Sequence, residues 1–192
     1  PAIRSGTILG KIIKQLFLIA LVALASGCTS WSEERCTSAD WERIGEDDGD
    51  AGRTPDYFDR YVERCAPHGI GPDRDAYLLG YTGGRDDYCT VRGGLDAGRD
   101  GRTYRGICDA GFEEDFLSGY AMGKRLLQID QQITAVSSRL RQFELELSHN
   151  ASLTDERRSY YLNETLRLRR ELARAEDDRR FLERRAAKML AE

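Results

Sequence analysis

Histidine, paired cysteine motifs and phosphate-binding loops are the features that this sequence lacks or nearly lacks. Only two histidines, His68 and His149, occur in 192 residues, which argues against a histidine-based catalytic triad or a multi-histidine metal site. No CxxC pair is present, and structural zinc sites usually draw their ligands from such close pairs. No GxxxxGK motif for phosphate binding occurs either. We therefore predict no catalytic residue, no metal and no cofactor.

A twenty-residue apolar run is also missing, although that length is needed to span a bilayer as a helix. The longest apolar stretch, within residues 15–28, is shorter, follows three basic residues and ends in small residues and Cys28. This order is expected of a secretory signal; a plain signal peptide or a short membrane anchor are the alternatives. The ending resembles the lipobox of bacterial lipoproteins, which implies that residues 1–27 are a signal peptide and that Cys28 carries the lipid. Thr29 is similar to the pattern of lipoproteins sent to the outer membrane.

Lysine is absent from residues 28–123, which carry 11 arginines against 21 acidic residues. Residues 124–192 carry 15 basic and 12 acidic residues. Nucleic acid is disfavoured as a partner, because phosphate binding needs concentrated positive charge on the folded face. We interpret the arginines of the second part as the solvated face of a helix.

The remaining four cysteines, Cys36, Cys65, Cys89 and Cys108, form an even set in an exported chain. In an oxidising compartment such a set predicts two disulfides. Three pairings are possible. We favour Cys36 with Cys65 and Cys89 with Cys108, since a helical hairpin over residues 40–65 would bring the first two to the same end.

Glycines recur in pairs that are four residues apart. The pairs are Gly45 and Gly49, Gly80 and Gly84, Gly94 and Gly98, and Gly119 and Gly123. Two short internal repeats contain them, GEDDGDAGR with GLDAGRDGR and LLGYTGGR with LSGYAMGK. Residues four apart share one helix face, and glycines there allow a second backbone to approach closely. We expect compact helix crossings with aromatic partners, namely Trp41, Tyr77, Tyr81, Phe116 and Tyr120.

The pattern as a whole predicts a mainly α fold. Helices are expected at about 40–50, 55–66, 73–87 and 113–147, with loop and a short helix around 90–109. Apolar residues from Leu126 to Leu147 repeat at alternating spacings of three and four, a heptad seam, and a second seam runs from Tyr161 to Met189 with an interruption at Arg179. We therefore predict a polar tether over 28–36, a disulfide-stapled, glycine-packed helical domain over 37–123 that folds by itself, and an antiparallel coiled-coil hairpin over 124–192.

Residues from Cys36 to Gly123 resemble the DUF2799 family of bacterial exported proteins. The resemblance rests on the four cysteines and the ordered glycines, together with Asp40-Trp41, Ile44-Gly45, Asp48-Gly49, Pro72-Asp73, Tyr88-Cys89 and Gly106-Ile107-Cys108. It implies a proteobacterial lipoprotein or periplasmic protein. The function of the family is unknown, so the resemblance assigns no site.

Few residues are candidates for chemistry. The acidic run Glu46, Asp47, Asp48 and Asp50 could bind a divalent cation, but we interpret it as a solvated helix face. The segment 96–101 is similar to a calcium loop, yet it lacks the bidentate glutamate. A glycan-binding or hydrolytic site could be built from acidic residues beside sugar-stacking aromatics. Its components would be Asp40, Asp48, Asp73, Trp41 and Tyr88.

Two functions of different classes follow. The first is a non-enzymatic lipoprotein of the outer membrane, facing the periplasm or the cell surface, whose hairpin binds another envelope protein or its own copy. The alternative is a cell-wall glycan-binding module or an acidic-residue hydrolase. Clustered carboxylates beside exposed aromatics would favour the alternative, and an exposed apolar stripe on the hairpin would favour the first.

Overall fold

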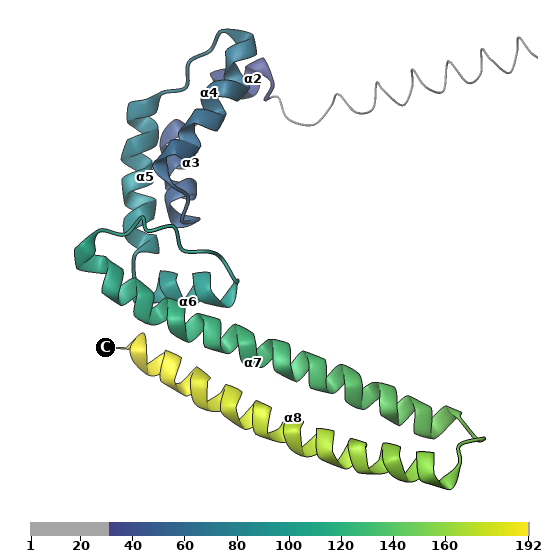
Figure 1. The fold of residues 1–192 in the computed structure, drawn as a ribbon. Helices are drawn as coiled ribbons and strands as arrows, with labels where there is room; N and C mark the ends of the chain where they lie inside the picture. Colours follow the sequence, from purple (N-terminus) through teal and green to yellow (C-terminus); the bar gives the residue numbers. More distant parts are fainter. Residues whose placement is uncertain (1–30, 192) are drawn as a thin grey trace, which may run out of the picture.

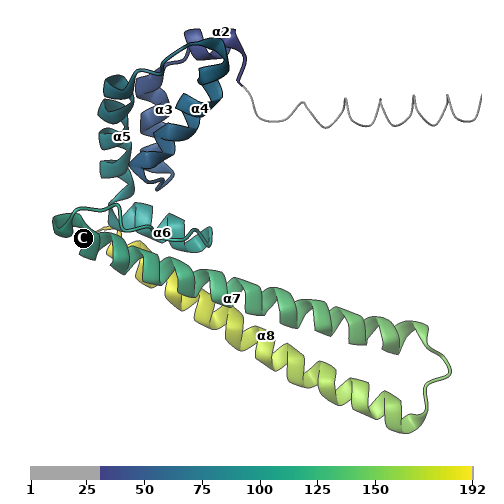
Figure 2. The ribbon, with the colours of Figure 1, turned by 45° about the horizontal axis from the view of Figure 1, so that its top comes forward.

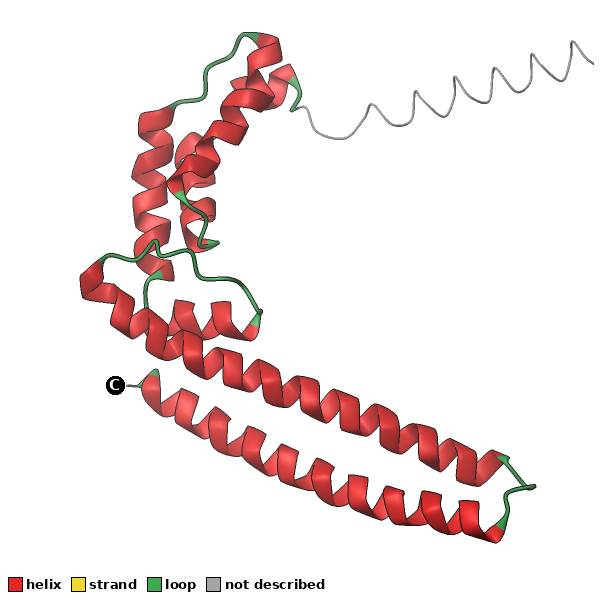
Figure 3. Cartoon of the chain, viewed as in Figure 1, coloured by secondary structure: helices red, strands yellow, loops and turns green. Residues whose placement is uncertain are grey.

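Helices make up all the regular structure in residues 31–191, the part of the chain that this computed structural model describes (Figures 1 and 3). In chain order they are α2 (Glu33–Thr37), α3 (Trp41–Asp50), η1 (Pro55–Phe58), α4 (Asp59–Cys65), η2 (Ala66–His68), α5 (Arg74–Tyr88), α6 (Val91–Arg99), α7 (Ala110–His149) and α8 (Asp155–Met189). The expected mainly α fold is confirmed. None of the helices within 31–191 combines the length and hydropathy of a membrane span. The predicted signal peptide and Cys28 lie outside the described residues.

Side-chain caps fix where several helices begin. Asp40 accepts a hydrogen bond from the Arg43 amide, Asp73 from the amides of Asp75 and Ala76, and Thr154 from the Arg157 amide. Each cap satisfies amide groups that have no partner within the helix. The observed bounds lie within a few residues of those expected.

Residues 90–109 contain the nine-residue α6 followed by loop, as expected. One local expectation differs from the structure. Residues 33–36, which are expected to belong to the polar tether, form most of α2, where Ser32 accepts a hydrogen bond from the Arg35 amide. Cys36 of α2 is buried, so the tether before the folded part is shorter than predicted.

The first glycine crossing packs α3 against α5. A Cβ atom built on Gly45 would collide with the Tyr77 carbonyl, and one built on Gly49 would collide with the Tyr81 carbonyl. From the first contact to the second, the residue numbers rise by four on both helices, so α3 and α5 run parallel. The chain returns between them through η1 and α4 (Figure 1). The close approach places backbone against backbone, which only glycine permits.

The second crossing repeats the first with α6 and α7. Gly94 faces the Phe116 carbonyl and Gly98 faces the Tyr120 carbonyl in the same parallel arrangement. The corresponding tyrosine also makes the same bond in each crossing: the hydroxyl of Tyr81 donates to the Arg53 carbonyl and that of Tyr120 to the Arg102 carbonyl, both at 2.7 Å. The short repeats in the sequence are therefore two copies of one structural unit.

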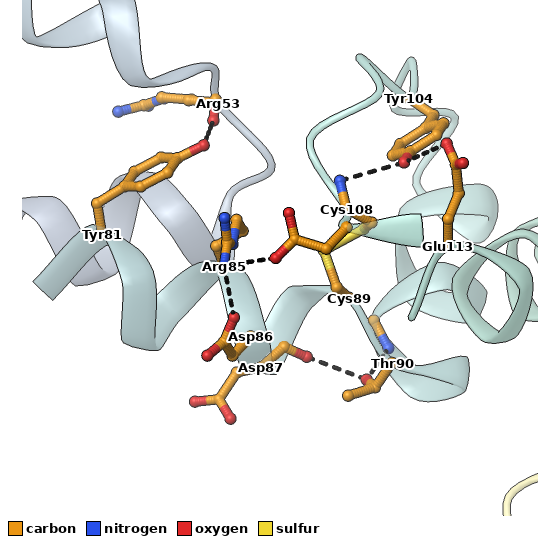
Figure 4. Close-up of a disulfide and its surroundings, with 12 residues drawn as sticks. Arg53, Tyr81, Arg85, Asp86, Asp87, Cys89, Thr90, Tyr104, Cys108 and Glu113 are labelled. Carbon is orange, nitrogen blue, oxygen red and sulfur yellow. Dashed lines mark hydrogen bonds and ion pairs between the residues drawn. A yellow bond between two sulfur atoms is a disulfide. The ribbon is translucent and has the colours of Figure 1, made fainter. Parts of the chain in front are cut away.

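Each disulfide links two chain segments at an end of one of these units. Cys36 joins Cys65, tying α2 to the end of α4, and Cys89 joins Cys108, tying the end of α5 to the loop before α7 (Figure 4). This is the pairing favoured from the sequence. The Cys36–Cys65 and Cys89–Cys108 links span 29 and 19 residues, and each contributes about 3 kcal/mol in the chain-entropy model.

The last two helices form a long antiparallel hairpin (Figure 2). The two apolar seams face each other along it, with Val136, Leu168 and Ala175 buried. Arg179, which interrupts the second seam, bonds Asp130 across the hairpin at 2.7 Å. The predicted interruption is thus an interhelical ion pair.

The second crossing and the hairpin share one core. α7 continues without a break past residue 123. Leu95 of α6 packs in one cluster with Leu126 of α7 and with Leu182 and Ala186 of α8. That residues 37–123 fold without the hairpin stays a prediction, and removal of α8 would expose Leu95 and Leu126.

Candidate functional site

A buried carboxylate, Asp48, lies at the centre of the first crossing. It is 1% exposed. The Tyr77 hydroxyl donates to its Oδ2 at 2.9 Å, and the Tyr61 hydroxyl donates to the same oxygen at 2.9 Å. Arg53 forms an ion pair with Oδ1. Two tyrosines and one arginine therefore compensate the charge that burial would otherwise penalise.

The ionisation states in this cluster are shifted by burial and by Asp48. Burial, followed by the hydrogen bond to Asp48, raises the pKa of Tyr61 and of Tyr77 far above the ordinary tyrosine value. Burial alone would lower the pKa of Arg53, but its interactions with the Asp48 carboxylate outweigh this and the pKa is raised. All three groups hold their protons at neutral pH, so they act as donors to Asp48.

The second crossing has no such cluster. In the aligned repeats Ala97 stands at the position of Asp48, and Phe116 stands at the position of Tyr77. Both replacements are fully buried, and the glycine contacts are unchanged. The crossing therefore forms without buried charge, and the Asp48 cluster is a feature of the first unit alone.

An open pocket of about 420 Å³ adjoins the cluster. Trp31, Arg35, Asp47, Asp48 and Arg53 are among the residues that line it. The Arg35 guanidinium stacks on the Trp31 ring, 4.2 Å from its centroid. All the bonds that Asp48 forms are internal, so the solvent-accessible groups of the pocket include the Trp31 ring, the Arg35 guanidinium and the Asp47 carboxylate.

The residues of the predicted glycan or hydrolase site lie at helix caps or in the buried core. Asp40 and Asp73 cap two different helices, and Asp48 is enclosed by tyrosines. Trp41 is 8% exposed and Tyr88 is 2% exposed, so neither ring presents a face on which a sugar could stack. All of them have structural roles in the crossings.

Metal ligands are not gathered anywhere in residues 31–191: no group of three or more histidine, cysteine or acidic side chains there could hold an ion. The acidic run of α3 was interpreted as a solvated face, and this is correct for Glu46, Asp47 and Asp50, which are exposed. It is wrong for Asp48, because that residue lies on the same helix face as Gly45 and Gly49 and is buried with them.

The distal half of the hairpin carries an exposed apolar surface, which we call the distal face. Leu162 and Leu166 of α8 are each at least half exposed. A groove of about 470 Å³ lies between the helices here, with Leu147, Leu162 and Leu166 on its walls. The hydroxyl of Thr165, which also lines this groove, has no hydrogen-bond partner within the described part of the chain.

Opposite charges flank the distal face. Glu144 and Arg169 line the same groove and form an ion pair across the hairpin at 2.7 Å. Both side chains are partly solvent-exposed, so this pair contributes little to the stability of the hairpin. Apolar walls with one charge of each sign at the margin are suited to binding another protein surface.

Among the comparisons with known proteins, a family model matches part of the chain. No curated protein and no solved structure matches it. The model of the family DUF2799, described as proteins of unknown function, matches residues 40–125. The matched range covers both glycine crossings and ends where α7 becomes the hairpin. Residues 40–125, which hold both crossings, are therefore similar to the DUF2799 family.

Proposed function

We propose that this protein is a non-enzymatic lipoprotein of the bacterial cell envelope, held in the outer membrane through Cys28, whose hairpin self-associates. The signal-like start of the sequence and the two disulfides support export. Aromatic rings buried against glycine crossings, in place of an open site, support a structural role. The distal face of the hairpin is the observation that carries the proposal.

A second copy of the chain suits the distal face because that surface is self-complementary. Leu162 and Leu166 protrude, and they also form the walls of the groove. In a two-fold arrangement each copy offers the same patch to the other, so protruding leucines of one copy meet the groove of its partner. Glu144 and Arg169 can then exchange partners between copies. Anchoring to one membrane raises the local concentration of both arms.

Replacement of two leucines tests this association. The secreted Cys28→Ser chain is expected to sediment as a dimer, and Leu162→Glu with Leu166→Glu is expected to weaken the dimer more than a hundredfold, because burial of two leucines contributes about 3 kcal/mol or more. Sedimentation equilibrium measures the change. Leu79→Glu, at a leucine of α5 that is 65% exposed, is the matched control and should leave the dimer intact. A monomeric parent chain, or equal effects at both places, would contradict the proposal.

Lipid attachment is tested separately by Cys28→Ser in the full-length chain. The unsubstituted protein is expected in the membrane fraction, because several acyl chains anchor a protein firmly. The variant is expected in the soluble periplasmic fraction, because it lacks the cysteine that carries the acyl chains. Fractionation with immunoblotting measures the distribution. Retention of the variant on membranes would count against anchoring by lipid.

A further inference from the structure

The first described residue of the chain is firmly attached to the folded part. The ring of Trp31 stacks on Trp41, with centroids 5.8 Å apart, and lies 5.2 Å from the ring of Tyr61. Its carbonyl oxygen lies 2.8 Å from Nε2 of His68. Trp31 therefore has contacts to α3, α4 and the η2 turn, and it is a fixed point of the first crossing.

Only Thr29 and Ser30 separate this fixed point from Cys28 in the sequence. Three residue steps span at most about 11 Å even in a fully extended chain. The headgroup layer on each side of a bilayer is itself roughly 5–8 Å thick. A lipid on Cys28 consequently leaves no room for a water-filled gap between Trp31 and the membrane.

The elements beside Trp31 form one end of the first crossing. α2 follows Trp31 directly and is tied to the end of α4 by the Cys36–Cys65 disulfide. Figures 1 and 2 both show α2 and the end of α4 at the end of the α3–α5 pair that is farthest from α6. α5 has 15 residues, so its two ends are about 22 Å apart.

We propose that this end of the molecule, made by Trp31, α2 and the turn after α4, lies on lipid headgroups, while the second crossing is held away from the bilayer. The proposal rests on the lipid anchoring put forward above. A half-buried tryptophan next to Arg35 suits such a place, since indole rings favour the membrane–water interface. Exposed Glu33 and Glu34 lie at the same end, so the short tether, and not attraction to anionic lipid, sets the contact.

Fluorescence quenching from the membrane surface tests the orientation. Full-length lipidated protein would be inserted into phosphatidylcholine vesicles that carry a quencher on some headgroups. A fluorescent amino acid would replace either Glu63, exposed near the end of α4, or Asp87, exposed near the end of α5. We expect loss of most of the emission at position 63 and of little at position 87.

Two controls separate this proposal from the anchoring itself. Flotation of the vesicles shows whether the protein is attached, and failure to float would overturn the lipid anchor. Attached protein with equal quenching at both positions would overturn the orientation alone. A flexible insertion of ten Gly and Ser residues between Ser30 and Trp31 should reduce the quenching at position 63 towards that at 87. Unchanged quenching after the insertion would show that the tether does not set the contact.

Discussion

Gly80→Ala is expected to destabilise the protein by about 3 kcal/mol, or to prevent folding, because overpacking at a rigid contact carries a cost of this order. A methyl group on Gly80 would lie against the carbonyl of Glu42 and close to the amide of Glu46. Both are backbone atoms of α3, so no side-chain rotation can relieve the collision. α3 and α5 would have to separate along the whole first crossing.

Gly83→Ala, on the same helix, is the matched control. Gly83 is exposed, and a methyl group there would meet nothing within 4 Å. Alanine is favoured over glycine within a helix by about 1 kcal/mol, so this variant should be more stable than the parent. Urea unfolding followed by circular dichroism gives both values. If the two substitutions changed the free energy of unfolding in the same direction, the close crossing would be wrong.

Asp48→Ala is expected to cost about 3–5 kcal/mol, the range found when one partner of a buried ion pair is removed. The change leaves the hydroxyls of Tyr61 and Tyr77 and the guanidinium of Arg53 without their shared acceptor. Tyr77 is fully buried and Tyr61 is 5% exposed, so their hydroxyls have little access to water as a replacement partner. Urea unfolding of the single variant measures the loss.

The second crossing suggests a partial rescue of that variant. Asp48→Ala combined with Tyr77→Phe reproduces the pair Ala97 and Phe116 that the second unit already carries. We expect the double variant to be more stable than Asp48→Ala alone, because one of the stranded hydroxyls is removed with its acceptor. A double variant less stable than Asp48→Ala would show that the two crossings do not pack in the same way.

The glycine crossings could be predicted from spacing, but their direction could not. Glycines four residues apart mark one helix face, and this face is the same whether the partner helix runs parallel or antiparallel. The direction depends on how α4 returns the chain between α3 and α5. The hairpin expected over residues 40–65 provides that return, whereas the glycine spacing alone does not.

Asp48 was misassigned, although a signal for its burial is present. Three neighbouring acidic residues made the run look solvated, and composition alone favours that interpretation. Asp48 is three residues after Gly45 and directly before Gly49, so it belongs to the face that the glycines define. The aligned repeat also carries Ala97 there, a residue compatible with burial. Helix geometry and the internal repeat together would have identified it.

The hairpin followed from the heptad spacing, whereas its contact with the second crossing did not. The heptad spacing predicts which residues of α7 and α8 face each other. Several of these residues, including Val136, Leu168 and Ala175, are buried. The packing of Leu182 and Ala186 on Leu95 depends on where α6 lies against α7. That position is set by the glycine crossing, so the cluster around Leu95 has members on both sides of residue 123.

A photocrosslinking amino acid at Leu166, in the full-length protein in living cells, tests the proposed self-association most directly. The account predicts a crosslinked species with twice the mass of the chain that contains only this protein. The same amino acid at Leu79, an exposed leucine outside the hairpin, should give no such species. Crosslinking at Leu166 to a different protein, or equal dimer yields at both positions, would contradict self-association through the distal face.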